Sequence, residues 1–162
     1  MSAEAGATVI AKVALSTPRS AEAVFDAWTN EAAIRLWMPL ALQAMGLSGQ
    51  LTAIRTHPVP GGDFLFADSR AEGEARHFGR YMEIDRARRL SFTWYTDEGD
   101  VESTSLVCLD LKTTHETRGE SVTWLSLEHM MDAEWKDYVE QTELGWRRLL
   151  EASCVDTTAL RV

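Results

Sequence analysis

Histidine is the residue type in this chain best suited to proton transfer or metal binding near neutral pH, and the 162 residues contain four of them. They stand at positions His57, His77, His115 and His129. These intervals are too long for a local metal-binding motif, and the sequence has no HExxH, GxSxG or glycine-rich phosphate loop. We therefore expect no metal ion and no cofactor. Most of the histidines are expected to be polar residues of strands and turns.

His129 is the exception, because of the strand predicted over residues 121–129. Side chains two residues apart share one face of a strand, so Leu125, Leu127 and His129 point the same way. If the two leucines face the interior, the imidazole faces it too.

Three carboxylates, Glu83, Asp85 and Glu128, could act as acid or base in an enzyme if burial shifted their pKa values. Tyr81 is a further proton-transfer candidate. Carboxylates are mostly exposed in folded proteins, so we interpret the three as surface residues. The residue types leave open whether any reaction is catalysed.

Six tryptophans are a high count for this length, and Trp37, Trp94, Trp135 and Trp146 stand at positions expected to face inward. Large rings can fill a core, or they can line a ligand pocket, which typically measures roughly 300–1,000 Å³. Both readings stay open. The residues expected to line such a cavity are Trp37, Phe64, Phe66, Tyr81, Phe92, Trp94, Leu125, Leu127, His129, Trp146 and Leu150.

Apolar and β-branched runs bounded by polar turns predict a series of strands. The expected strands cover residues 8–15, 50–56, 63–67, 77–84, 90–96, 103–111 and 121–129. Short connections favour antiparallel neighbours, since a parallel crossover needs a dozen or more residues. For residues 77–84 both alternating sets contain bulky side chains, so the pattern does not decide which set faces inward.

Helices are expected before and after this meander. Ser20 and Asn30 are suited to cap two short helices, the second of which should stop at Pro39. A long amphipathic helix is expected from Asp132, with Trp146 and Leu150 on its apolar stripe. Together these elements predict an α+β fold in which a curved antiparallel sheet covers the last helix.

Composition limits the classes of function. A net charge of −9 and a pI near 4.9 argue against nucleic-acid binding, and no apolar stretch is long enough to span a membrane. The first residues lack the features of a secretory signal, so a cytoplasmic protein with Cys108 and Cys154 reduced is expected. We expect one domain over residues 1–162, with residues 156–162 as a frayed end.

Several segments, in order, resemble the START-like superfamily, also called SRPBCC or Bet v 1-like, with its helix-grip fold. They are AEAVFDAWTNEAAIRLWMP, PGGDFLF, FGRYMEIDRARRLSFTW, SVTWLSLEH and the pair Gly145-Trp146. Within the superfamily the chain is similar to the activator of Hsp90 ATPase homologue type, over about residues 8–154. The resemblance implies a curved sheet around a long C-terminal helix, with two short helices after the first strand.

Three functions are compatible with that resemblance, since one fold serves many functions. Binding of a small hydrophobic or aromatic molecule between sheet and last helix is favoured, with entry near Trp37, Pro39 and Gly61-Gly62. The alternatives are a polyketide cyclase-like enzyme using His129, Tyr81 or Glu83 in the same cavity, and a chaperone-regulating module. Leu144 and residues 40–47 are the candidate exposed apolar surface, for which a homodimer contact is an equally good reading.

Overall fold

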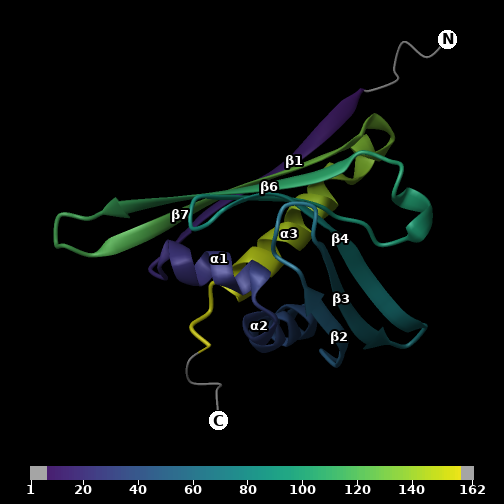
Figure 1. Ribbon diagram of the computed structural model, residues 1–162, viewed down its shortest axis with the longest axis horizontal. Helices are drawn as coiled ribbons and strands as arrows, with labels where there is room; N and C mark the ends of the chain where they lie inside the picture. The colour runs from purple at the N-terminus through teal and green to yellow at the C-terminus, as the bar shows by residue number, and fades with distance from the viewer. Residues whose placement is uncertain (1–6, 158–162) are drawn as a thin grey trace.

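The computed structural model describes residues 7–157, and within them seven antiparallel strands form one sheet in the order β1-β7-β6-β5-β4-β3-β2. The strands are β1 (Thr8–Thr17), β2 (Leu51–Thr56), β3 (Asp63–Arg70), β4 (Gly73–Asp85), β5 (Arg89–Thr93), β6 (Ser105–His115) and β7 (Ser121–Asp132). The sheet curves so strongly that its two ends lie on either side of the C-terminal helix (Figure 1). The predicted helix-grip α+β fold is confirmed.

The helices lie on the concave side of the sheet (Figure 1). They are α1 (Ala21–Thr29), α2 (Glu31–Ala44) and α3 (Val139–Ser153), with the 3-10 turns η1 (Glu98–Asp100) and η2 (Ala133–Tyr138). Both predicted caps are confirmed. Ser20 Oγ accepts a hydrogen bond from the Ala23 N–H at 3.1 Å, and Asn30 Oδ1 accepts one from the Ala33 N–H at 3.0 Å. None of the helices within residues 7–157 is long and apolar enough to cross a lipid bilayer.

The prediction that the second helix stops at Pro39 is wrong, because α2 continues to Ala44. Proline cannot donate to the carbonyl of Arg35, so this turn lacks one helical hydrogen bond. The residues after it supply the compensation: Ala41 and Leu42 are buried in the core, at 0% and 2% exposure. Tertiary burial therefore outweighs the local effect of the proline.

The last helix begins later than predicted. Asp132 ends β7 and makes no side-chain cap, since a 3-10 turn follows it and α3 starts at Val139. Its carboxylate instead accepts a hydrogen bond from the Thr104 N–H at 3.2 Å, which ties the η1 loop to β7. Trp135 lies on the turn rather than on the helical stripe and is 40% exposed.

The ambiguity over residues 77–84 has a structural cause, because β4 changes its alternation partway along. A β-bulge lies between Tyr81 and Glu83 in the pairing with β5. Before it, His77 and Tyr81 face the concave side, and after it Ile84 packs against the core. The bulge lets each of the two alternating sets supply inward side chains, one in each half of the strand.

Of the two candidate exposed apolar regions, Leu144 and residues 40–47, only the first presents a large hydrophobic side chain that is exposed. Leu144 is exposed as expected, at 50%. In the segment 40–47, by contrast, Leu42 is buried, and Leu40, Met45 and Leu47 pack against the core. Of the predicted frayed end, residues 158–162 lie outside the described part of the chain.

Each edge strand of the sheet has a backbone N–H covered by a glutamate from a helix. On β1 the Lys12 N–H donates to Glu143 of α3 at 2.8 Å. On β2 the Thr56 N–H donates to Glu31 of α2 at 3.0 Å. Helix side chains thus bond to groups that an edge strand otherwise leaves open.

Candidate functional site

A pocket of about 390 Å³ lies between the sheet and α3, at the end of the molecule that carries η1 and η2. Strands β3, β4, β6 and β7, the segment that follows β5, both 3-10 turns and one face of α3 contribute to its lining. Most of the remaining space under the sheet is filled by packed side chains. The molecule therefore has a pocket at one end of the space between the sheet and α3, rather than a cavity along the whole length of that space.

Aromatic rings form much of the pocket wall. Trp94 and Trp146 lie with ring centroids 4.9 Å apart, and Trp135 stands at the surface beside them. His77 stacks on Trp94 at 5.2 Å with an angle of 27° between the rings. Flat, rigid walls of this kind suit a planar ligand, because rings stack on one another at similar distances.

His129 faces the interior, as the alternation with Leu125 and Leu127 indicated, and it lies in a chain of hydrogen bonds. Its Nδ1 accepts from Trp146 Nε1–H at 2.9 Å, and its Nε2 lies 2.8 Å from Ser105 Oγ. An indole nitrogen can only donate, so Nδ1 is unprotonated and the proton of the neutral ring is on Nε2. Ser105 Oγ in turn donates to the Trp94 carbonyl. Both imidazole nitrogens are therefore hydrogen-bonded, one to the Trp146 ring and one to the Ser105 hydroxyl that holds the Trp94 backbone.

Burial lowers the pKa of His129 to about 4, because the charged imidazolium would lose its hydration. The ring is only 6% exposed. At neutral pH His129 is therefore neutral and fully hydrogen-bonded. This arrangement positions Trp146 and offers no free nitrogen lone pair to a substrate.

A polar cluster at the β3–β4 end of the pocket consists of Asp68, Arg70 and His77. Asp68 is completely buried, and Arg70 donates to its carboxylate from Nε at 2.8 Å and from Nη2 at 3.3 Å. Arg70 and His77 both line the pocket, and His77 Nδ1 is a buried atom with no hydrogen-bond partner among the described residues. Burial, and then the charge of Arg70, lower the pKa of His77, while Asp68 and the nearby Phe66 backbone oppose them more weakly, so this ring is also neutral.

Asp68 and Arg70 did not emerge from the sequence, although a signal was present. Extended by the two-residue period, the inward face that carries Phe64 and Phe66 also carries Asp68 and Arg70. The predicted strand ended at residue 67, whereas β3 continues to Arg70. Recognising the longer strand would have placed an ion pair on the concave face.

The predicted lining residues divide into two groups. Trp94, His129 and Trp146 lie on the pocket wall. The others are in the packed core and do not line this pocket: Trp37, Phe64, Phe66, Tyr81, Phe92, Leu125, Leu127 and Leu150. Tyr81 donates its hydroxyl to the Trp28 carbonyl at 3.0 Å, and burial raises its pKa above the ordinary value. The phenol is thus committed to holding α1 against the sheet.

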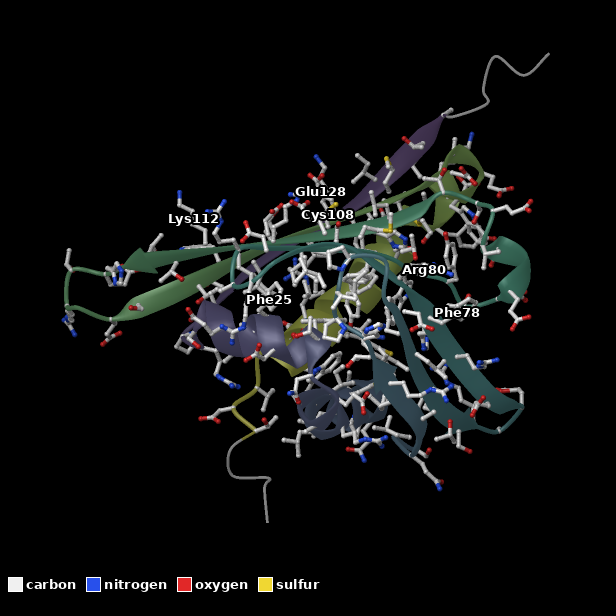
Figure 2. All side chains as sticks on the ribbon, in the orientation of Figure 1. Phe25, Phe78, Arg80, Cys108, Lys112 and Glu128 are labelled. Atoms are coloured by element: carbon white, nitrogen blue, oxygen red, sulfur yellow. The ribbon has the colours of Figure 1, made fainter. Side chains whose placement is uncertain are left out.

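The carboxylate candidates lie away from the pocket. Glu83 accepts from Arg89 at 2.8 Å, in an exposed cluster with Asp110. Asp85 pairs with Arg88 at 3.2 Å. Glu128 projects from the convex side of the sheet, together with Cys108 and Lys112 (Figure 2). The expected solvated roles account for all three carboxylates.

The predicted entrance does not coincide with the pocket. Trp37 is 1% exposed and donates to the Ala27 carbonyl at 2.5 Å. Gly61 and Gly62 form backbone hydrogen bonds with Tyr81 at the start of β3, whereas the pocket lies at the other end of that strand, beside Arg70. From the segment after Pro39, only Met45 reaches the pocket wall.

A second, larger hollow of about 940 Å³ lies on the outer face of β2 to β4. Phe78 and Arg80 of β4 project on that side (Figure 2), with the half-exposed Met82 and Val101 beside them. Both acidic and basic side chains line it, and among the described residues no buried polar atom without a partner lies in it. Among residues 7–157 no group of three or more histidine, cysteine or acidic side chains is arranged to hold a metal ion.

Solved structures share this fold at low sequence identity. A protein of unknown function from Staphylococcus aureus aligns over 91% of this chain and 93% of its own, with a TM-score of 0.65 and 13% identity. A Chromobacterium violaceum protein aligns over 91% and 94%, with a TM-score of 0.63 and 17% identity. The Aha1 dimer from Colwellia psychrerythraea aligns over 89% and 92%, with a TM-score of 0.63 and 14% identity.

A comparison with curated protein sequences gave no match. A family model described as Activator of Hsp90 ATPase homolog 1-like protein matches residues 18–153. That match covers most of the chain and includes both short helices, strands β2 to β7 and α3. The chain therefore belongs to the Activator of Hsp90 ATPase homolog 1-like family.

Proposed function

We propose that this protein binds a small aromatic or hydrophobic molecule in the pocket between the sheet and α3. The observation that supports it most directly is the tryptophan wall around a space of about 390 Å³. That volume is within the range of ligand pockets, near its lower end, and suits a molecule of one or two rings.

The fixed hydrogen bonds around His129 support binding rather than catalysis. A chain from Trp146 through His129 and Ser105 to the Trp94 carbonyl orients the Trp146 indole and fixes the backbone at Trp94 before any ligand arrives. Preorganised walls lower the entropic cost of binding. The same bonds occupy the histidine that the enzyme hypothesis would require as a base.

Gly145 offers a way to test the site without unfolding the protein. It lines the pocket on α3, and a Cβ added there would meet no heavy atom within 4 Å. Gly145→Phe should therefore fill the pocket, while the exchange of a helical glycine for phenylalanine favours the helix by roughly a few tenths of a kcal/mol. We expect this variant to keep its Tm and to lose binding of a naphthalene-sized probe, measured by tryptophan fluorescence and calorimetry.

Leu144→Phe is the matched control, because Leu144 is the neighbouring residue, is half-exposed and does not line the pocket. Its probe affinity should equal that of the unmodified protein. Unchanged binding in Gly145→Phe would show that aromatic molecules bind elsewhere. Native mass spectrometry of the purified protein, followed by extraction, would identify any molecule carried with it.

A second candidate function, regulation of the Hsp90 ATPase, comes from the name of the family. The observation that favours it is the outer hollow, where Met82 and Val101 are 53% and 48% exposed beside Arg80. Met82→Ser and Val101→Ser should then reduce stimulation of the chaperone's ATPase and leave probe binding unchanged. An ATPase rate that the unmodified protein does not alter would exclude this function.

A further inference from the structure

The Asp68–Arg70 pair orients a guanidinium toward the pocket. A buried carboxylate without a partner lowers the stability of the folded state. Arg70 is the partner of Asp68, to which it donates hydrogen bonds from Nε and Nη2. The planar fork fixes the plane of the guanidinium group, so the three N–H hydrogens not directed at Asp68 have set directions. Arg70 lines the pocket and keeps 28% of its side chain exposed.

His77 adds a second polar atom to the same end of the pocket. It stands opposite Phe66 in the β3–β4 register, stacks on Trp94, and is close enough to Arg70 for that charge to influence its ionisation. Its Nδ1 is buried and lacks a partner in the described part of the chain. An unsatisfied buried polar atom costs about 1–3 kcal/mol, so such atoms usually mark a bound water, ion or ligand.

We propose that the pocket selects aromatic carboxylic acids, with the ring against Trp94 and Trp146 and the carboxylate on Arg70 and His77. This inference rests on the proposed binding function and names its substrate class. Arginine has no acceptor atom, so a ligand group beside it must accept hydrogen bonds. A carboxylate matches the planar fork, and the neutral His77 can donate from Nδ1 in the corresponding tautomer.

The charges around the pocket disfavour more than one negative charge on the ligand. Asp68 already compensates Arg70, and Asp100 on η1 also lines the pocket. Together with Arg70 these carboxylates leave a net negative charge, so a dianionic group such as a phosphate would meet about twice the electrostatic repulsion of a monocarboxylate. A monocarboxylate adds one charge, at the end of the pocket where the donors are.

The test compares 2-naphthoate with 2-naphthamide, which have the same rings and differ in the charged group. Calorimetry on the unmodified protein should show naphthoate binding roughly 10- to 100-fold more tightly, the range expected for a hydrogen bond to a charged group. The double variant Asp68→Asn/Arg70→Gln replaces the buried ion pair by a matched neutral pair. It should lose this preference and keep its affinity for the amide.

Two further variants separate the donors. Arg70→Lys keeps the charge next to Asp68 and loses the fork, so the preference should fall only in part. His77→Phe keeps a ring stacked on Trp94 and removes Nδ1, which should reduce the preference several-fold. Arg118→Gln, on the exposed β6–β7 turn, removes the same charge far from the pocket and should change nothing.

The outcomes distinguish the two proposals. Equal affinity for acid and amide, both abolished by Gly145→Phe, would overturn the acid selectivity and leave the binding function intact. A preference that survives in the Asp68→Asn/Arg70→Gln variant would also overturn it, since the charge would then be recognised elsewhere. Failure of both probes to bind would contradict the pocket as a site for aromatic molecules, and with it both proposals.

Discussion

The two halves of the space under the sheet contain the same residue types and are organised differently. In the central half, Trp28, Phe92 and Tyr81 pack with Phe64 and Trp37 into a core whose large side chains are almost fully buried. At the other end, Trp94 and Trp146 stand beside an open pocket with His77 and Arg70. Aromatic content alone therefore does not distinguish a core from a binding site.

The polar atoms of the two halves differ in their surroundings. In the core, the Tyr81 hydroxyl and the Trp37 indole each have a backbone carbonyl as partner. In the pocket half, the His77 Nδ1 has none among residues 7–157. The core also holds one buried polar atom without a partner among residues 7–157, the Trp28 Nε1, so the position of His77 on the pocket wall, and not the missing partner alone, marks the binding site.

The largest expected contrast comes from truncating one ring in each half. Phe92→Ala should lower the free energy of unfolding by about 3–5 kcal/mol, because it leaves a void in close-packed surroundings. Trp94→Ala should cost less, since Trp94 is only partly buried and already borders a pocket. Chemical denaturation of both variants measures the two values, and equal losses would mean that the pocket half is packed as tightly as the core.

A pH series should destabilise the protein through the pocket half. The pKa of His129 is about 4 in the folded state against about 6.5 unfolded, so the unfolded state takes up the proton first as the pH falls. Stability present above pH 6.5 should therefore decrease between pH 6.5 and 4, by roughly 3 kcal/mol from this residue.

His129→Gln is the variant that assigns this loss. It should flatten the dependence of unfolding free energy on pH without abolishing it, because the pKa of His77 is lowered in the same direction. Identical pH profiles for variant and unmodified protein would show that His129 does not titrate in this way.

The smallest expected effect is in the core. Tyr81→Phe removes the hydroxyl that donates to the Trp28 carbonyl and should cost about 1 kcal/mol, independent of pH below neutrality. Tyr138→Phe is the control, since Tyr138 is 50% exposed. Thermal unfolding of the pair measures the difference, and no difference would mean that the Trp28 carbonyl finds another partner.

Local sequence patterns predicted much of this fold, because helix capping and strand alternation depend on residues that are close together in the sequence. Cap residues at Ser20 and Asn30 act on the adjacent turn, and the alternation of Leu125, Leu127 and His129 follows from strand geometry. The inward position of His129 could therefore be predicted from three residues.

The predictions that were wrong or incomplete concern features that depend on contacts between residues far apart in the sequence. The helix continues through Pro39 because Ala41 and Leu42 are buried against other elements, which no local pattern reveals. The bulge in β4 depends on its change of partner from β3 to β5. The pocket is the part that remains unfilled after all large side chains have packed, so its position follows only from the whole chain.

The glutamates at the two sheet edges also restrict how this protein can assemble. Carboxylates from α2 and α3 bond to backbone N–H groups of β2 and β1, at the only two strands of the described sheet that lack a second neighbour. An extended peptide or a second copy would have to displace them before adding a strand. Growth of the sheet from molecule to molecule is thereby opposed at both ends, and association through side-chain surfaces is left as the easier route.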